Sequence, residues 1–217
     1  MENVADQLAD SAPRFARDAL EALSAGDAVG FALYAATSLE HLLKCYLARK
    51  HPALVVDGKH VDSLLHACGQ EAAAETKRDQ VRTISGVESL ERVARFLPLI
   101  GSSDREILVQ LFGVRNGAVH LANTASVDRF VLPFLRVSEL LREALVLERG
   151  DYWGEYVNLA DSTIEEHVEA ADLKAKAAVG AAKERFADAS TASMTARRSS
   201  RSQRSKPTAF AGTRSSP

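Results

Sequence analysis

A chain of 217 residues has room for one folded domain with appendages, and its 46% hydrophobic content can supply a core. From residue 197 onward the chain has six bases and no acid, so an acidic body precedes a basic tail. No apolar run approaches the ~20 residues needed to cross a membrane, and the acidic start of the chain, residues 1–6, lacks the features of a secretory signal. These features exclude a membrane-spanning protein and lead us to expect a cytoplasmic one.

The composition predicts an all-α fold, because Ala, Leu, Glu and Arg outnumber the strand-forming residues. The spacing of the apolar residues then indicates where the helices lie. The predicted helices cover residues 3–24, 27–50, 60–68, 85–97, 103–117 and 125–149. Pro52 ends the second of these, and breaks or kinks are expected near Pro13 and Pro133. The segments Ser85-Gly86-Val87-Glu88 and Ser103-Asp104-Arg105-Glu106 are predicted capping boxes.

The composition predicts three parts: a helical bundle over 1–150, a long charged helix over 151–190 and a Ser/Arg-rich disordered tail over 191–217. The helix has a thin apolar stripe, and it can lie across the bundle, pair with its counterpart in a dimer or receive a partner. Its first aromatic residues, Tyr152, Trp153 and Tyr156, are expected to anchor it by packing. Three interpretations of the tail stay open. It can be a solvated segment, it can bind RNA phosphates loosely, or it can be a remnant of a longer protein.

Cysteine and histidine spacing predicts no metal and no cofactor. Cys45 and Cys68 lie on helical segments and are expected to be buried thiols, since two distant cysteines make no disulfide framework. His60, His66 and Cys68 lie near Asp62, but this spacing fits no recognised zinc pattern.

The segment Arg115-Asn116-Gly117-Ala118-Val119-His120 carries the strongest functional signal. On an unbroken helix, five residues at about 100° each would leave Arg115 and His120 roughly 140° apart. Gly117 can end the helix, which would let His120 turn back beside Arg115. An arginine fork suits a phosphate and a histidine titrates near neutral pH, so the pair matches the chemistry of phosphodiester cleavage.

This motif at the end of an amphipathic helix, in a small all-helical chain, resembles the HEPN family over about residues 1–150. The resemblance implies a helical bundle that dimerises, with R-x4-6-H motifs from two subunits forming one metal-independent endoribonuclease site. Arg115 and His120 match the motif, and Asn116 matches the polar residue that follows its arginine. Ala122 stands where HEPN toxins often carry a tyrosine, so regulation by modification of that tyrosine is not expected.

The resemblance implies a hydrolase that binds RNA and uses its 2′-hydroxyl as the nucleophile. His120 would act as base or acid, Arg115 would stabilise the phosphorane, and Asn116 would hold the arginine or a phosphate oxygen. The family further implies a toxin-antitoxin or antiviral defence setting, with a homodimer and an antitoxin or other regulatory protein as partners.

The second predicted helix supplies further candidates. Glu40 and Lys44 have the i,i+4 spacing of a surface ion pair. In HEPN folds this helix lies near the motif, so Glu40, His41 or Lys44 can instead approach Arg115, orienting it or touching substrate. For His120, the alternative is a histidine that merely binds local carbonyl groups at the helix end.

Two functions that involve no catalysis stay open. The bundle can be a noncatalytic HEPN-like module that binds RNA, nucleotide or a protein. It can also be a dimerising scaffold whose C-terminal helix acts through a partner.

Overall fold

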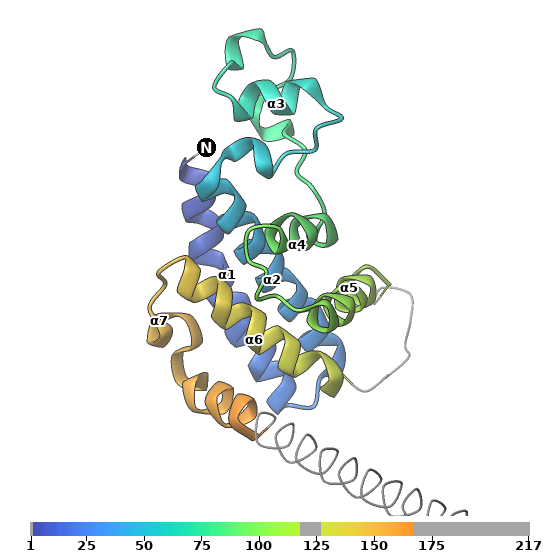
Figure 1. Ribbon diagram of the computed structural model, residues 1–217, viewed down its shortest axis with the longest axis vertical. Helices are drawn as coiled ribbons and strands as arrows, with labels where there is room; N and C mark the ends of the chain where they lie inside the picture. Colours follow the sequence, from blue (N-terminus) through green and yellow to red (C-terminus); the bar gives the residue numbers. More distant parts are fainter. Residues whose placement is uncertain (1, 118–126, 167–217) are drawn as a thin grey trace, which may run out of the picture. The chain divides into compact units, whose positions relative to one another are not determined.

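The computed structural model describes residues 2–117 and 127–166, which form a helical bundle (Figure 1). Its named α-helices are α1 (Glu2–Ser24), α2 (Ala28–Lys50), α3 (Val61–Ala67), α4 (Gly86–Ala94), α5 (Ser102–Gly117), α6 (Asp128–Ala144) and α7 (Arg149–Trp153). Within the described ranges the sole β-type pairing is an isolated bridge between Val56 and Thr83, so the predicted all-α class is confirmed. None of the helices in these ranges is long and apolar enough to cross a membrane.

The first two helices form an antiparallel hairpin through a glycine-based helix end. Gly26 has φ +72°, its N–H binds the carbonyl of Leu23, and the N–H of Asp27 binds the carbonyl of Ala22. The Asp27 carboxylate then caps α2 by accepting from the N–H of Gly30 at 2.9 Å. The break expected near Pro13 is absent, because α1 runs through it.

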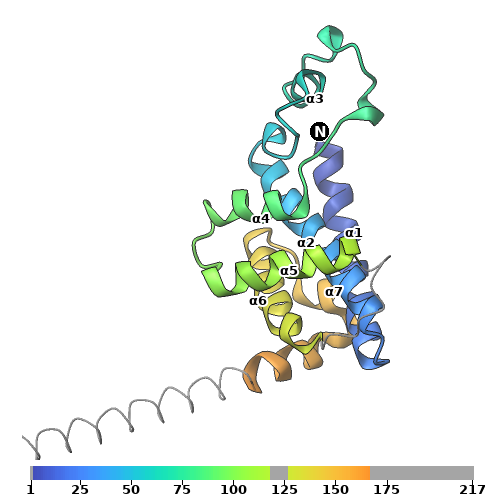
Figure 2. The ribbon, with the colours of Figure 1, turned by 90° about the vertical axis from the view of Figure 1, so that its right-hand side faces the viewer.

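Helix α2 is the centre of the bundle, since it packs against α1, α4, α5 and α6. Figure 2 shows α4 and α5 crossing it on one side. Apolar side chains are therefore buried on several of its faces, among them Phe31, Leu39, Leu42, Leu43 and Leu47. A helix buried on most sides is expected to be apolar nearly all round, so its charged residues need partners.

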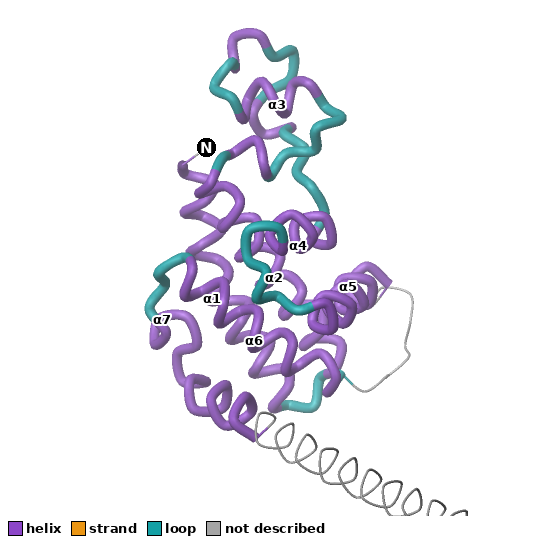
Figure 3. Tube along the Cα trace, viewed as in Figure 1, coloured by secondary structure: helices purple, strands orange, loops and turns teal. Residues whose placement is uncertain are grey.

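Residues 55–84, here called the α3 lobe, form an extension made of α3, short 3-10 turns and loops (Figures 1 and 3). The Asp62 carboxylate accepts from the N–H groups of Glu75 and Thr76, at 3.3 and 3.0 Å. His66 Nε2 donates to the Thr76 carbonyl at 2.7 Å. These side-chain bonds add to backbone bonds of the lobe, such as that from the Asp57 N–H to the Arg82 carbonyl at 2.9 Å.

Several helix ends differ from prediction. Helix α4 ends at Ala94 rather than residue 97. Helix α5 begins at Ser102, and the Arg105 N–H donates to the carbonyl of Gly101, so Ser103 lies inside the helix and is not its N-cap. The other predicted cap is present, with Ser85 Oγ accepting from the Glu88 N–H at 3.2 Å.

The predicted helix over 125–149 is split. Helix α6 runs through Pro133 but ends at Ala144, where Val146 takes φ +56° and the Leu147 N–H binds the Arg142 carbonyl. The predicted helix over 151–190 does not start as one element, since α7 stops before Gly154, at φ +58°, and helix resumes over 157–166. The remainder of that helix and the predicted tail over 191–217 lie outside the described residues.

The aromatic anchor at this junction is confirmed for two residues. Tyr152 and Trp153 are fully buried, and Trp153 packs edge-on against Phe134 with ring centroids 6.0 Å apart. Trp153 Nε1 also donates to the Glu139 carboxylate. Tyr156 is partly buried against the core.

The two cysteines differ in environment. Cys45 is buried, and burial raises the pKa of its thiol to about 11. Cys68 is exposed at the end of α3, so the prediction of a buried thiol is wrong there.

Val146→Gly is expected to raise the free energy of unfolding by about 1 kcal/mol, because a β-branched residue is strained at φ > 0. Val146 is 86% exposed, so the change removes little packing. Urea denaturation followed by circular dichroism measures the difference. Val146→Ala keeps a Cβ at the strained position and should give a much smaller gain; an equal gain from both variants would contradict the explanation.

Candidate functional site

The crossing of α2 and α5 brings the predicted motif arginine against the predicted carboxylate. One oxygen of Glu40 accepts from Arg115 Nη1, and the other accepts from Lys44 Nζ at 2.6 Å. Lys44 Nζ also donates to Thr83 Oγ1 at 3.0 Å. Glu40 therefore joins α2 to α5 directly, and it joins the α3 lobe through Lys44.

These charged side chains are largely shielded from water. The exposed fractions are 11% for Lys44, 14% for Glu40 and 25% for Arg115. Ion pairs at this depth are screened little by salt, and removing one partner leaves a charge that water solvates poorly. The arrangement is therefore more than a surface i,i+4 pair.

Asn116 receives the remaining edge of the arginine fork. Its Oδ1 accepts from Arg115 Nε and from Arg115 Nη2, each at 3.3 Å. Both bonds are near the long limit for N–H···O contacts, and Asn116 is exposed. Glu40 thus holds one side of the guanidinium firmly, while Asn116 holds the other side weakly.

The two cations determine the protonation of Glu40. Burial alone would raise the pKa of Glu40, but the hydrogen bonds and charges of Lys44 and Arg115 outweigh burial and lower it from its ordinary value. Glu40 is therefore ionised at neutral pH. With one carboxylate between two cations, the cluster carries a net positive charge.

His41 follows Glu40 but turns toward α1. Its Nδ1 lies 2.7 Å from Ser11 Oγ, and its ring packs edge-on against Phe15 at 5.3 Å between centroids. Burial lowers the pKa of His41; Glu40 opposes this shift, whereas Lys44 and Arg115 reinforce it. Ser11 Oγ also lies 3.2 Å from the Leu8 carbonyl oxygen, to which it can donate.

The predicted approach of α2 to the motif is thus found for Glu40, which binds Arg115, while its i,i+4 pair with Lys44 forms as well. His41 makes its polar contact with Ser11 instead of with Arg115. His120 lies outside the described residues, as does Ala122.

Sequence reasoning missed Thr83 and Ser11. Thr83 lies 39 residues from Lys44, and Ser11 lies 30 residues from His41. Each is a single hydroxyl on a distant segment, and no periodicity connects it to its partner.

The residues considered for a metal are used within the α3 lobe. Asp62 and His66 bind the backbone at Thr76, and His60 Nε2 lies 3.3 Å from Arg82 Nη1. Over residues 2–117 and 127–166, no three His, Cys, Asp or Glu side chains are grouped as metal ligands.

Comparisons of this chain with family models, with curated proteins and with solved structures find no significant match.

Glu40→Gln should lower the free energy of unfolding at pH 7 by about 2 kcal/mol, because it leaves two shielded cations without their anion. The folded-state pKa of Glu40 lies below its ordinary value of 4.5. Its contribution is therefore complete above about pH 4.5 and is lost as pH falls through the lowered pKa. Urea denaturation from pH 7 to about pH 3 should show the difference between wild type and variant shrinking with acid.

Glu88→Gln is the matched control. Glu88 also makes an i,i+4 ion pair at 2.6 Å, with Arg92, but its side chain is 50% exposed. Loss of this exposed ion pair should lower the free energy of unfolding by less than about 0.5 kcal/mol. If Glu40→Gln lowered the free energy of unfolding by the same amount at every pH, the pairing argument would be contradicted.

Proposed function

We propose that this chain is a cytoplasmic, metal-independent endoribonuclease of HEPN type. The observation that carries the proposal is the Glu40–Arg115 ion pair, which holds the arginine of the predicted motif in a defined position at the surface of the bundle. The R-x4-H spacing of Arg115 and His120 supplies the resemblance, and the all-α fold is compatible with it.

The environment of Arg115 suits a phosphate. The guanidinium is 25% exposed, so a ligand can reach it, and its Nε and Nη2 edge carries only the two long bonds to Asn116. A phosphate oxygen offers a charge-assisted bond in place of a neutral amide oxygen. The net positive charge of the cluster favours the same exchange.

Cleavage would then follow from the chemistry of RNA. The 2′-hydroxyl attacks the adjacent phosphorus and the bond to the 5′-oxygen breaks, which leaves a 2′,3′-cyclic phosphate and a 5′-hydroxyl. His120 takes the hydroxyl proton or supplies a proton to the leaving oxygen. Arg115 stabilises the charge that builds on the phosphorane.

A homodimer would bring a second motif to the site and let two histidines divide the acid and base roles. Exposed apolar side chains on α2 and α5 support an interface here. Val29 and Leu33 lie one turn apart on α2 and are 50% and 42% exposed, and Val114, next to Arg115, is 36% exposed. An antitoxin or other regulatory protein would control such an enzyme.

The test is cleavage of total cellular RNA in EDTA by full-length wild type, Arg115→Ala and His120→Ala. Wild type should produce 2′,3′-cyclic phosphate ends, and each variant should lose at least about 100-fold in rate, the range expected for a general acid-base or charge-stabilising group. Circular dichroism and sizing should show that the variants keep their helix content and assembly.

Arg105→Ala is the control for loss of a cross-helix ion pair. Arg105 lies on the same helix, and its Nη1 lies 3.5 Å from a carboxylate oxygen of Glu91 on α4. It should cleave as wild type does. A strict need for a divalent metal would overturn the mechanism, and RNA binding without cleavage would favour the noncatalytic module.

A further inference from the structure

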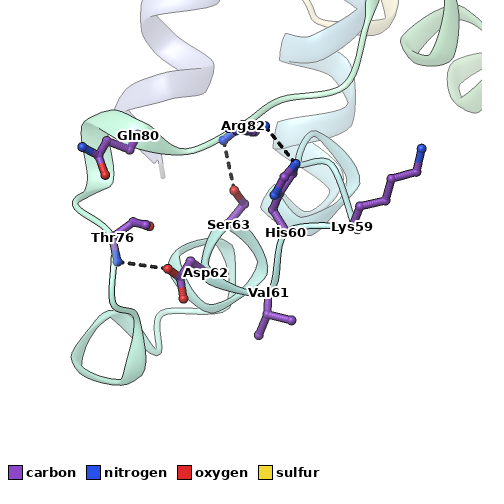
Figure 4. A pocket seen from close by; sticks show the side chains of 8 residues that line it. All are labelled: Lys59, His60, Val61, Asp62, Ser63, Thr76, Gln80 and Arg82. Atoms are coloured by element: carbon purple, nitrogen blue, oxygen red, sulfur yellow. Dashed lines mark hydrogen bonds between the residues drawn. The ribbon is translucent and has the colours of Figure 1, made fainter.

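A polar cavity of about 470 Å³ lies in the α3 lobe, away from Arg115 (Figure 4). It opens between the first turn of α3 and the chain segment over 76–82. Its volume falls within the range of small-ligand pockets. None of its lining residues belongs to the site described above.

The cavity wall presents mainly hydrogen-bond donors. Lys59 and Arg82 line it and are exposed, and among the described residues neither forms an ion pair. Arg82 Nη1 donates to His60 Nε2 at 3.3 Å, which orients the guanidinium. Ser63 is 3% exposed and accepts the Arg82 N–H at 3.0 Å, so its own hydroxyl hydrogen stays available.

The described wall contains one acid beside the two cations, so these charges leave a positive balance. Asp62 is the acidic member of the described lining, and each of its oxygens accepts a backbone N–H, from Glu75 and from Thr76. Figure 4 shows its carboxylate turned toward Thr76. A complementary ligand is therefore rich in acceptors and negatively charged, as a phosphate group is.

The cavity connects to the Arg115 cluster through adjacent side chains. Arg82 precedes Thr83, whose hydroxyl accepts from Lys44 at 3.0 Å. Lys44 binds Glu40 at 2.6 Å, and Glu40 binds Arg115. A series of side-chain contacts thus links the segment that carries Arg82 to the Arg115 cluster.

We propose that the α3 lobe cavity binds a backbone phosphate of the RNA strand on one side of the scissile position. This inference rests on the proposed ribonuclease function, because it takes RNA as the ligand. Lys59 and Arg82 hold the phosphate, and the Ser63 hydroxyl donates to one of its oxygens. The lobe thereby sets the length of strand that the enzyme needs.

The test uses a labelled 2′-O-methyl oligonucleotide, which the enzyme cannot cut because it lacks the nucleophilic hydroxyl. Fluorescence anisotropy compares full-length wild type with Lys59→Ala/Arg82→Ala over a range of salt. We expect about tenfold weaker binding. The dependence of log K on log salt should become shallower by roughly 0.7, since the variant loses one single-strand phosphate contact and each such contact contributes about 0.7.

The matched control is Lys77→Ala/Arg78→Ala, which removes two charges from the same lobe outside the cavity wall. It should bind within about twofold of wild type. An equal loss of oligonucleotide affinity in both double variants, or no loss of affinity in either, would overturn the proposal. The main-chain bonds of Arg82, to Ser63 and from Asp57, do not need its side chain, so the lobe should stay folded.

Two further outcomes separate this proposal from the ribonuclease itself. If wild type fails to cut RNA in EDTA but the cavity variant alone loses oligonucleotide binding, the cavity assignment stands and the ribonuclease falls. If wild type cuts RNA and the cavity variant binds as tightly as wild type, the cavity assignment falls alone. Calorimetric binding of uridine monophosphate without binding of the oligonucleotide would overturn it in favour of a free nucleotide.

Discussion

One carboxylate, that of Glu40, fixes the relation between three parts of this bundle. It lies on the central helix, where burial makes an unpaired charge unfavourable. Each of its two oxygens is therefore paired with a cation. Lys44 satisfies it along α2 and extends the contact to Thr83 in the α3 lobe, while Arg115 satisfies it from α5. The orientation of the motif arginine is therefore a consequence of how α2 is buried.

A second polar position on α2 works in the same way. Ser38 is fully buried; its hydroxyl donates to the Ala12 carbonyl at 2.9 Å and lies 3.0 Å from the hydroxyl of Tyr152. Burial raises the pKa of Tyr152 to about 12, so that hydroxyl stays protonated and can donate. Ser38 thus attaches the segment after α6 to the α1–α2 hairpin, while Glu40, two residues further along, attaches α5. The central helix uses its few polar residues to determine where its neighbours dock.

The sequence predicts what is local and misses what depends on distant partners. The limits of α1 and α2 follow from Gly26, Asp27 and Pro52, whose effects are confined to their own turns. The end of α6 at Val146 could not be read from the sequence, because valine is a poor residue for φ > 0. Arg142 and Arg49 hold that turn by donating to the carbonyls of Leu147 and Leu145, a tertiary arrangement. The Glu40–Arg115 contact could be anticipated only through the resemblance, since 75 residues separate the two.

The Glu40 carboxylate has two opposed effects on any anion that binds Arg115. It lowers the positive potential at the guanidinium, which weakens long-range attraction. It also removes most of the rotamer freedom of a side chain that carries about 2 kcal/mol of such entropy, so a ligand need not bear that cost on binding. Because Lys44 shares the same carboxylate, the loss of potential is partial, whereas the immobilisation of Arg115 is retained. Preorganisation of this kind favours a ligand that meets the arginine at one defined edge, and the edge that faces the exposed Asn116 meets that condition.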